Sequence, residues 1–491
     1  MSYILAIDQG TSSTRVMLYT LQGLLVTSSQ YPLTQHYPQA GWVEHDPEEI
    51  WQKTLTALRD VTTGISPNLI LSCGITNQRE TTVIWNKKTW QCIAPAIVWQ
   101  DRRTEQYCQE LSDYSSTIQD KTGLLPDPYF SASKLNWLLN SIPQAKESAM
   151  RGELAFGTID SFLVWRLTKG ANHLTDITNA SRTLLFNIKE ERWDSELLRL
   201  FEIPESVLPE VLASDGHFGA IAKEWLGFTI PITGVAGDQQ AALIGQGCFE
   251  DGMAKATFGT GGFLLLNTGD TPVKSKHHLL TTIAYKIKGK TAYGLEGGIY
   301  HAGTTVKWLR DEMKLISTSS ETETLAQSLE NNGGLYFVSA FTGLGAPHWL
   351  CSSGAIMTGI SRASNKAHFA RAALEGVCYQ TREMLDCMRE DSGLALSLLR
   401  VDGGMAVNRW FLQFLADQCQ LTIQKPKDIE TTAKGAAILA GLGCGAFASL
   451  ADLQHAWSFE QEFNPVRSYE EVERDYSGWK NALVKVKAES F

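Results

Sequence analysis

The chain has 491 residues, which predicts two or three domains because a single core rarely grows beyond about 300 residues. Hydrophobic residues make up 43% of the sequence and charged residues 20%, a balance that excludes a mainly disordered chain. The net charge of −10 argues against binding to nucleic acid, which usually needs a basic face, and against docking on an anionic membrane.

Cysteine usage and hydropathy bear on the compartment. The nine cysteines are scattered without a Cys-x-x-Cys pair, which predicts free thiols in a reducing compartment and no zinc site. The longest apolar stretch, residues 435–450, contains four glycines and is too short to span about 30 Å of hydrocarbon. The first residues carry no basic segment or cleavage site of a signal peptide. We therefore expect a cytoplasmic protein with no stable membrane insertion.

Two similar hairpins are predicted far apart in the chain. Residues 3–7 and 15–19 read as strands around the turn at 8–13, and residues 253–258 and 263–267 read as strands around the turn at 259–262. A strand, a Gly-Thr turn and a strand recurring after about 250 residues favour two related domains. We place the boundary near residues 247–252, which gives domains 1–248 and 249–491.

Helices are predicted between the strands. Asp46 can cap a helix that begins at Pro47, and Glu49 can complete a capping box. Residues 367–390 form a long helix candidate, and strand-like runs at 230–235 and 398–401 alternate with helices, which predicts mixed sheets of the α/β class. The expected inner face of the long helix is Phe369, Ala373, Val377, Met384 and Met388.

The two turns are rich in hydroxyls and glycine. Gly10 lets the backbone approach a ligand, and Thr11, Ser12 and Ser13 can direct N–H groups and hydroxyls at phosphate oxygens. Asp8, at a strand end, can hold Mg²⁺. The turn at 259–262 follows the same logic, so the pair suggests the two halves of a phosphate clamp. An ordinary hairpin turn is the alternative for each.

A third glycine turn, at residues 402–408, joins an apolar strand to a helix. Its glycines would let an adenosine lie against the backbone, and Asn408 can supply hydrogen bonds. A tight strand-to-helix turn with Asn408 as the helix cap is the alternative.

Two polar clusters follow predicted strands. In residues 77–81, Arg79 and Glu80 offer donors beside an acceptor, which suits a small polyol. In residues 237–240, the carboxylate of Asp238 can accept a proton from a substrate hydroxyl opposite a transferring phosphate. Trp99 can add an aromatic wall. Salt-bridged loops and core packing are the alternatives.

Taken together, these segments resemble the glycerol kinases of the FGGY carbohydrate kinase family, which has the actin-like ATPase fold. The resemblance runs from about residue 4 to about residue 485. It is carried by residues 6–11, 74–81, 98–104, 127–132, 178–183, 237–242, 340–347 and 401–404. The stretches Asn-Gln-Arg-Glu-Thr and Gly-Asp-Gln-Gln separate this group from the pentulose and hexulose kinases of the family.

The resemblance implies two actin-like (ribonuclease H-like) ATPase domains with a cleft between them, and transfer of phosphate from ATP to glycerol to give sn-glycerol 3-phosphate. Asp238 matches the general base, and Asp8 matches the Mg²⁺ position. The positions matching glycerol contacts and aromatic walls are Arg79, Glu80, Trp99, Tyr129, Asp238, Gln239 and Phe263. The positions matching nucleotide contacts are Thr11, Ser12, Ser13, Arg15, Thr260, Gly303, Lys307, Gly404 and Asn408.

The sequence departs from the family pattern at three places. Lys307 stands where glutamine is usual, and Leu350 stands where an acidic residue is usual. Residues 224–230 replace a glycine-rich, arginine-containing loop that binds fructose 1,6-bisphosphate in some members, so we expect no inhibition by that compound.

Three other functions stay open at this point. They are kinase action on another short polyol, a binding or regulatory protein that has lost catalysis, and a chaperone-like or filament-forming ATPase. The resemblance also implies a homo-oligomer, and the sequence does not choose between a dimer and a tetramer.

Overall fold

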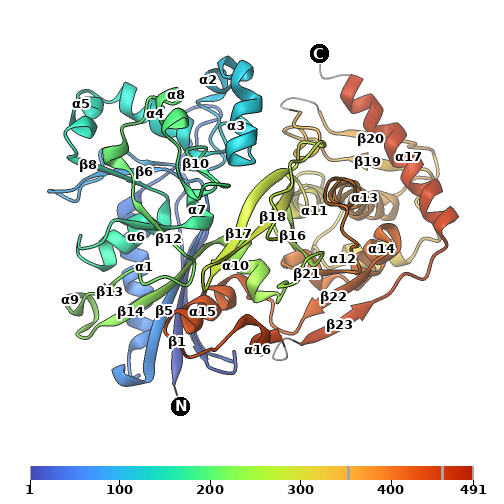
Figure 1. Cartoon of the computed structure of the whole chain (residues 1–491). Helices are drawn as coiled ribbons and strands as arrows, with labels where there is room; N and C mark the ends of the chain where they lie inside the picture. Colours follow the sequence, from blue (N-terminus) through green and yellow to red (C-terminus); the bar gives the residue numbers. More distant parts are fainter. Residues whose placement is uncertain (1, 351–353, 455–457, 489–491) are drawn as a thin grey trace.

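The computed structural model describes residues 2–350, 354–454 and 458–488, and contains two large mixed sheets, one in each half of the chain (Figure 1). The first sheet has the order β13 (Ala220–Ile221), β14 (Ile230–Gly237), β5 (Ile70–Asn77), β1 (Tyr3–Gln9), β2 (Ser13–Thr20) and β3 (Leu25–Pro32). The second has the order β17 (Leu280–Ile287), β18 (Lys290–Ile299), β16 (Gly262–Gly269), β15 (Ala254–Phe258), β21 (Leu398–Asp402), β22 (Thr422–Pro426) and β23 (Phe459–Phe463).

The two sheets repeat one pattern of pairing. In the first, β1 is antiparallel to β2 and parallel to β5, which is parallel to β14. In the second, β15 is antiparallel to β16 and parallel to β21, which is parallel to β22. Both predicted hairpins are therefore confirmed, and they occupy equivalent places in two related α/β units.

Helices cover the sheets. The helices of the first half are α1 (Pro47–Thr62), α2 (Glu105–Glu110), α3 (Ser115–Thr122), α4 (Ser131–Ser141), α5 (Ala145–Met150), α6 (Ile159–Leu167), α7 (Ile177–Ala180), α8 (Ser195–Leu200), α9 (Lys223–Leu226) and α10 (Asp238–Gly245). The second carries α11 (Gly303–Asp311), α12 (Glu321–Gln327), α13 (Lys366–Ser392), α14 (Arg409–Cys419), α15 (Thr431–Gly443), α16 (Leu450–Gln454) and α17 (Tyr469–Ala488).

Helix α1 begins where the sequence predicts, but its cap is simpler than expected. Asp46 accepts a hydrogen bond from the N–H of Glu48 at 2.8 Å. Glu49 does not close a capping box, because its carboxylate instead accepts from the N–H and hydroxyl of Thr34. The predicted inner face of α13 is buried at four of its five positions, and Phe369 is partly buried against the same core.

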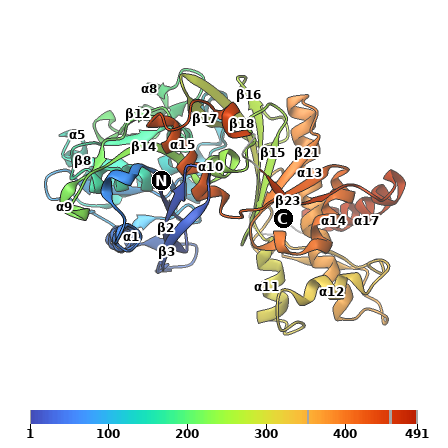
Figure 2. The ribbon, with the colours of Figure 1, turned by 90° about the horizontal axis from the view of Figure 1, so that it is seen from below.

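Helix α15 belongs to the second half by sequence, yet it packs against α10 and against β1, β5 and β14 of the first sheet (Figures 1 and 2). Glycines permit this close contact. A Cβ added to Gly74 would lie 2.1 Å from the carbonyl oxygen of Ala436, and one added to Gly435 would lie 1.8 Å from that of Ala241. The two halves are thus joined by helix-to-sheet packing as well as by the chain connection.

Candidate active site

The residues expected to bind the polyol gather where the two halves meet. Arg79 follows β5, and its guanidinium lies with Nε 3.2 Å from Oδ1 of Asp238 at the start of α10. Glu80, the next residue, has a φ of +58°. A left-handed conformation is unfavourable for a non-glycine residue by about 1–2 kcal/mol, and such strain is typical of positions where the direction of a side chain matters.

Aromatic rings close one side of this cluster. Trp99 packs edge-on against Tyr129 at 5.6 Å and against Phe263 at 6.1 Å between ring centroids. Trp99 also donates its indole N–H to the hydroxyl of Thr11 at 2.9 Å. The aromatic wall therefore combines rings from both halves and reaches the first hydroxyl-rich turn.

Asp238 is the most exposed carboxylate of the cluster, with 30% of its side chain accessible. Its Oδ1 accepts from the N–H of Gln239 at 2.7 Å and faces Arg79 Nε. Its Oδ2 has no hydrogen bond to the residues that the structure describes. Burial raises the pKa of Asp238, and the positive charges of Arg79 and Lys255 oppose that shift. An accessible carboxylate with one free oxygen and a raised pKa is suited to accept a proton.

Asp8 lies at the end of β1 and is half-buried, and its carboxylate makes no hydrogen bond to other described residues. Burial raises its pKa to about 7, Arg15 opposes the shift, and the nearby charges of Asp238 and Glu430 add to it. A divalent cation would relieve this unfavourable negative charge. Among the described residues, no group of three or more side chains that could hold a metal ion occurs.

The first turn, Gly10 to Ser13, is held by its own hydrogen bonds. The N–H of Gly10 donates to the carbonyl of Ser13 at 2.9 Å, and the carbonyl of Ser12 accepts from the N–H of Leu33. The hydroxyl of Ser13 accepts from Gln30 at 2.8 Å. Arg15 forms an ion pair with Glu430, next to α15, so its guanidinium is engaged.

The second turn, Gly259 to Gly261, supports the start of α11. The carbonyl of Thr260 accepts from the N–H groups of Ala302 and Thr304, both at 3.1 Å. A Cβ added to Gly303 would lie 2.4 Å from the carbonyl oxygen of Gly259, so the helix can lie this close only with glycine at that position. Lys307, one turn further along α11, is exposed.

The third glycine turn lies beside the second. A Cβ added to Gly404 would meet no atom within 4 Å, so the backbone there borders open space. Asn408 caps α14, accepting from the N–H of Phe411 at 2.9 Å, and its amide donates to Thr322 at 3.2 Å. The helix-cap interpretation of Asn408 is therefore confirmed, and both ends of its side chain are occupied.

Three charged residues of the cluster received no role from the sequence: Arg182, Lys255 and Glu296. Arg182 follows α7, while Lys255 and Glu296 lie in β15 and β18 of the second sheet. All three are buried, and they contact Arg79, Glu80 or Gln239. A signal was available for Lys255, which is the only charged residue of β15, and a weaker one for Glu296, which is the only acidic residue of β18.

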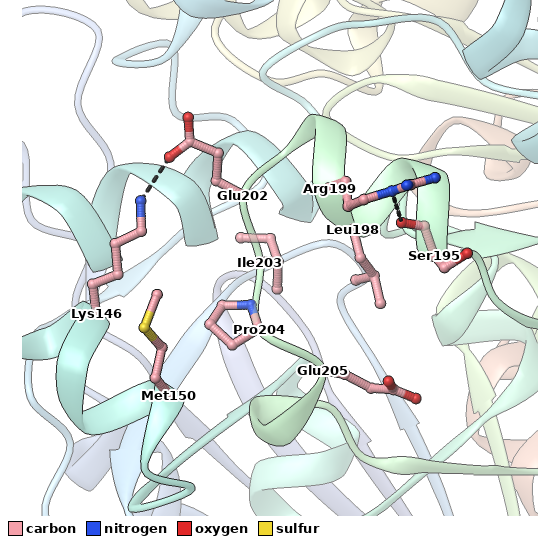
Figure 3. A pocket seen from close by; sticks show the side chains of 9 residues that line it. All are labelled: Lys146, Met150, Ser195, Leu198, Arg199, Glu202, Ile203, Pro204 and Glu205. Carbon is pink, nitrogen blue, oxygen red and sulfur yellow. Dashed lines mark hydrogen bonds and ion pairs between the residues drawn. The ribbon is translucent and has the colours of Figure 1, made fainter.

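A separate hollow of about 590 Å³ lies on the outer surface of the first half (Figure 3). Lys146 and Glu202 form an ion pair at 2.6 Å across it, and Arg199 turns back to the carbonyl of Ser195. It contains none of the expected site residues. Its lining is Lys146, Met150, Ser195, Leu198, Arg199, Glu202, Ile203, Pro204 and Glu205.

Two further expectations concern the whole chain. The eight cysteines among the described residues are free thiols. Within that same part of the chain, none of the helices has the length and apolar character needed to cross a membrane.

Leu350 is partly buried against the core of the second half, and nothing in the structure explains its departure from the family pattern.

Comparison with known proteins gives matches along nearly the whole chain. Residues 3–245 match the N-terminal domain, and residues 254–444 the C-terminal domain, of the FGGY family of carbohydrate kinases. The chain is 50% identical to the glycerol kinase of Ectopseudomonas mendocina and to glycerol kinase 1 of Pseudomonas aeruginosa, with 99% of each chain covered.

Solved structures agree. The crystal structure of Plasmodium falciparum glycerol kinase with ADP superposes with a TM-score of 0.94 at 39% identity, covering 99% of this chain and 98% of that one. A xylulose kinase from Lactobacillus acidophilus, 23% identical, superposes with a TM-score of 0.89 over 99% of both chains and shares the fold.

Proposed function

The chain belongs to the FGGY family of carbohydrate kinases, and we propose that it is a glycerol kinase that transfers the γ-phosphoryl group of ATP to glycerol and forms sn-glycerol 3-phosphate. The observation that carries this proposal is the Arg79–Glu80–Asp238 cluster, walled by Trp99 and Phe263. It combines hydrogen-bonding groups for a small polyol with a carboxylate placed to take a proton.

Glycerol would lie against the aromatic wall, with its hydroxyls on Arg79, Glu80, Tyr129 and Gln239. Arg79 makes two long hydrogen bonds, each of 3.3 Å, to the hydroxyl of Tyr129 and to the amide of Gln240. These are the contacts that a substrate hydroxyl would replace at the smallest cost, because hydrogen bonds weaken with length.

Asp238 would act as the general base. Its free Oδ2 would accept the proton of the attacking hydroxyl, while Arg79 and the N–H of Gln239 hold Oδ1. Because phosphoryl transfer needs little covalent chemistry from the protein, positioning and charge stabilisation would supply most of the rate. Exclusion of water from the interface between the halves would suppress hydrolysis of ATP.

The nucleotide would lie on the second half, between the 259–261 turn, the start of α11 at Gly303 and the open backbone at Gly404. Thr11, Ser12 and Thr260 would face the phosphates from the two turns, and Lys307 would reach them from α11. Asp8 would hold Mg²⁺, which neutralises phosphate charge when bound with ATP. Ser13, Arg15 and Asn408 would also contact the nucleotide; like Thr11, which accepts from Trp99, they have protein partners that would hold them in place.

The division into domains 1–248 and 249–491, mainly for glycerol and mainly for nucleotide, is part of this proposal. The packing of α15 on the first sheet adds a shared element between them. The cytoplasmic location and the homo-oligomer stay predictions from the sequence.

The test is ADP release by the purified protein with MgATP, with and without glycerol, together with identification of the product. Glycerol-dependent release with formation of sn-glycerol 3-phosphate is the expected result. Faster turnover on another polyol would favour the first alternative function, and ATP hydrolysis that ignores polyols would overturn the proposal.

A further inference from the structure

Glu296 lies in the middle of β18, in the second sheet, yet the hydrogen bonds of its carboxylate are with the first half of the chain. Its Oε2 accepts from Nη1 of Arg79 at 2.5 Å, and its Oε1 accepts from Nη2 of Arg79 at 3.0 Å. The same Oε1 accepts from Nη2 of Arg182 at 2.9 Å. One buried carboxylate thus holds two arginines of the other half.

Arg182, the second of these arginines, connects Glu296 to Glu80 of the polyol cluster. Nε of Arg182 donates to Oε1 of Glu80 at 2.7 Å. Arg79 and Glu80 are neighbours in sequence, but Arg79 Nε and Glu80 Oε1 are 3.9 Å apart, too far for a hydrogen bond. Arg79 and Glu80 are instead linked by the hydrogen bonds that Glu296 and Arg182 make with them and with each other.

Because these four charged side chains are buried, their removal from water costs free energy. Arg79, Arg182, Glu80 and Glu296 are each 3% exposed or less. The two arginines hold the pKa of Glu296 down to about 2 against the effect of burial, so Glu296 is ionised. An apolar cluster of the same volume would stabilise the fold at least as well as buried ion pairs do. Stability alone therefore does not account for a four-residue charge network at this place.

We propose that Glu296 is a positioning residue for the glycerol site: it sets the orientation of Arg79 directly and of Glu80 through Arg182. This inference rests on the proposed function and adds to it a residue that the second half supplies to the substrate site of the first. The bidentate contact on Nη1 and Nη2 fixes the plane of the Arg79 guanidinium, which leaves Nε facing Asp238.

The test is steady-state kinetics of Glu296→Gln with glycerol and MgATP varied separately. Loss of the charge-assisted contacts is expected to raise KM for glycerol about tenfold or more while KM for MgATP changes less than about twofold. Glu296→Asp keeps the charge and is expected to recover part of the loss. An equal change in both KM values, or no change in a folded variant, overturns the inference.

Glu375→Gln is the matched control. Glu375 is equally buried, at 2% exposure, and pairs with Arg371 at 2.7 Å within α13, outside the site. It is expected to lower the melting temperature and to leave both KM values unchanged. If Glu296→Gln does not fold, Glu296→Asp decides: a rise in KM for glycerol alone supports the inference, and unchanged KM overturns it. Absence of glycerol-dependent ADP release in the wild type overturns the proposed function and this inference together.

Discussion

The two halves have the same strand pairing but differ at three equivalent positions. Where one half has an aspartate, the other has a threonine. The first half has Asp8 at the end of β1, Thr76 paired beside it on β5, and Asp238 at the start of α10. The second half has Thr257 on β15, Asp402 paired beside it on β21, and Thr431 at the start of α15. We call these the Asp–Thr–Asp and Thr–Asp–Thr clusters.

The exchange gives the clusters opposite characters. Asp402 is 2% exposed and accepts a hydrogen bond from Thr431, itself 1% exposed, and its charge is balanced by Lys255. In the first half, the side chains of Asp8 and Asp238 are partly exposed. The difference lies in exposure, because Oδ1 of Asp402 also lacks a hydrogen-bond partner among the described residues but is buried. Two carboxylates at the outer positions therefore stay accessible at the proposed active site, whereas the single carboxylate at the inner position is enclosed.

The largest expected effect is on the Asp–Thr–Asp cluster at Asp238. Asp238→Asn removes the proton acceptor but keeps the shape, so we expect kcat to fall about a thousandfold while glycerol still binds. Rapid-quench kinetics and a glycerol titration would measure the two quantities. Turnover near the wild-type value would refute the role of Asp238 as the base.

The next effect is expected at Asp8. Asp8→Asn is predicted to lower kcat/KM for MgATP about a hundredfold, because it removes the carboxylate proposed to hold Mg²⁺. Calorimetry of MgADP binding gives a readout independent of turnover, and MgADP should bind more weakly to the variant. If the variant binds MgADP as tightly as the wild type, the metal role belongs elsewhere.

A substitution in the Thr–Asp–Thr cluster should lower the stability of the fold and have little effect on catalysis. Asp402→Asn keeps the volume but weakens the hydrogen bond from Thr431 and removes the negative charge that offsets that of Lys255, so we expect the free energy of unfolding to fall by about 1–3 kcal/mol. Urea denaturation would measure it. We expect kcat to change far less than in Asp238→Asn, and a comparable loss would remove the distinction between the two clusters.

Lys255 lies between the clusters, donating to Gln239 of the first half and to Thr257 of its own. Burial lowers the pKa of Lys255 to about 8, against the charges of Asp402, Asp238 and Glu296, which raise it, while Arg79 adds to the lowering.

Because a lysine with a lowered pKa loses its charge as the pH rises through that value, we expect KM for glycerol to increase severalfold between about pH 7 and pH 9. A pH series of KM would measure this rise. Lys255→Met should already have the higher KM at neutral pH and show little further change. A flat KM in the wild type would contradict a role for the lysine charge.

The smallest effect on activity is expected from fructose 1,6-bisphosphate, whose binding loop in some family members is replaced here by residues 224–230, outside both clusters. Glu224 pairs with Lys169 at 2.8 Å, and Trp225 packs against Trp51 at 5.0 Å, so this segment is held against the first half by paired and apolar side chains. We expect low-millimolar fructose 1,6-bisphosphate to leave activity unchanged. Clear inhibition in the ADP-release assay would show that this segment, or another, binds the compound.

Much of the candidate site was predictable from local sequence. The local pattern of a short stretch is enough to place a residue at a strand end. Such stretches are the turns rich in glycine and threonine and the polar residues directly after apolar strands. Asp8, Arg79 and Asp238 were found in this way. The family resemblance added residues such as Phe263 and Gly303, which no local pattern singles out.

Local sequence was sufficient to predict the hairpins, the α/β class and the polar groups at the strand ends, because strand periodicity and turn chemistry depend on only a few neighbouring residues. Only the tertiary structure showed that Glu296 and Lys255 from the second sheet hold residues of the first half, and that α15 packs across the boundary. The contacts of Glu296 with Arg79 and Arg182 join residues 217 and 114 positions apart, and even the Lys255–Gln239 contact spans 16 positions. A local sequence pattern does not show such pairs, because they form only where folding buries a charge against its partner.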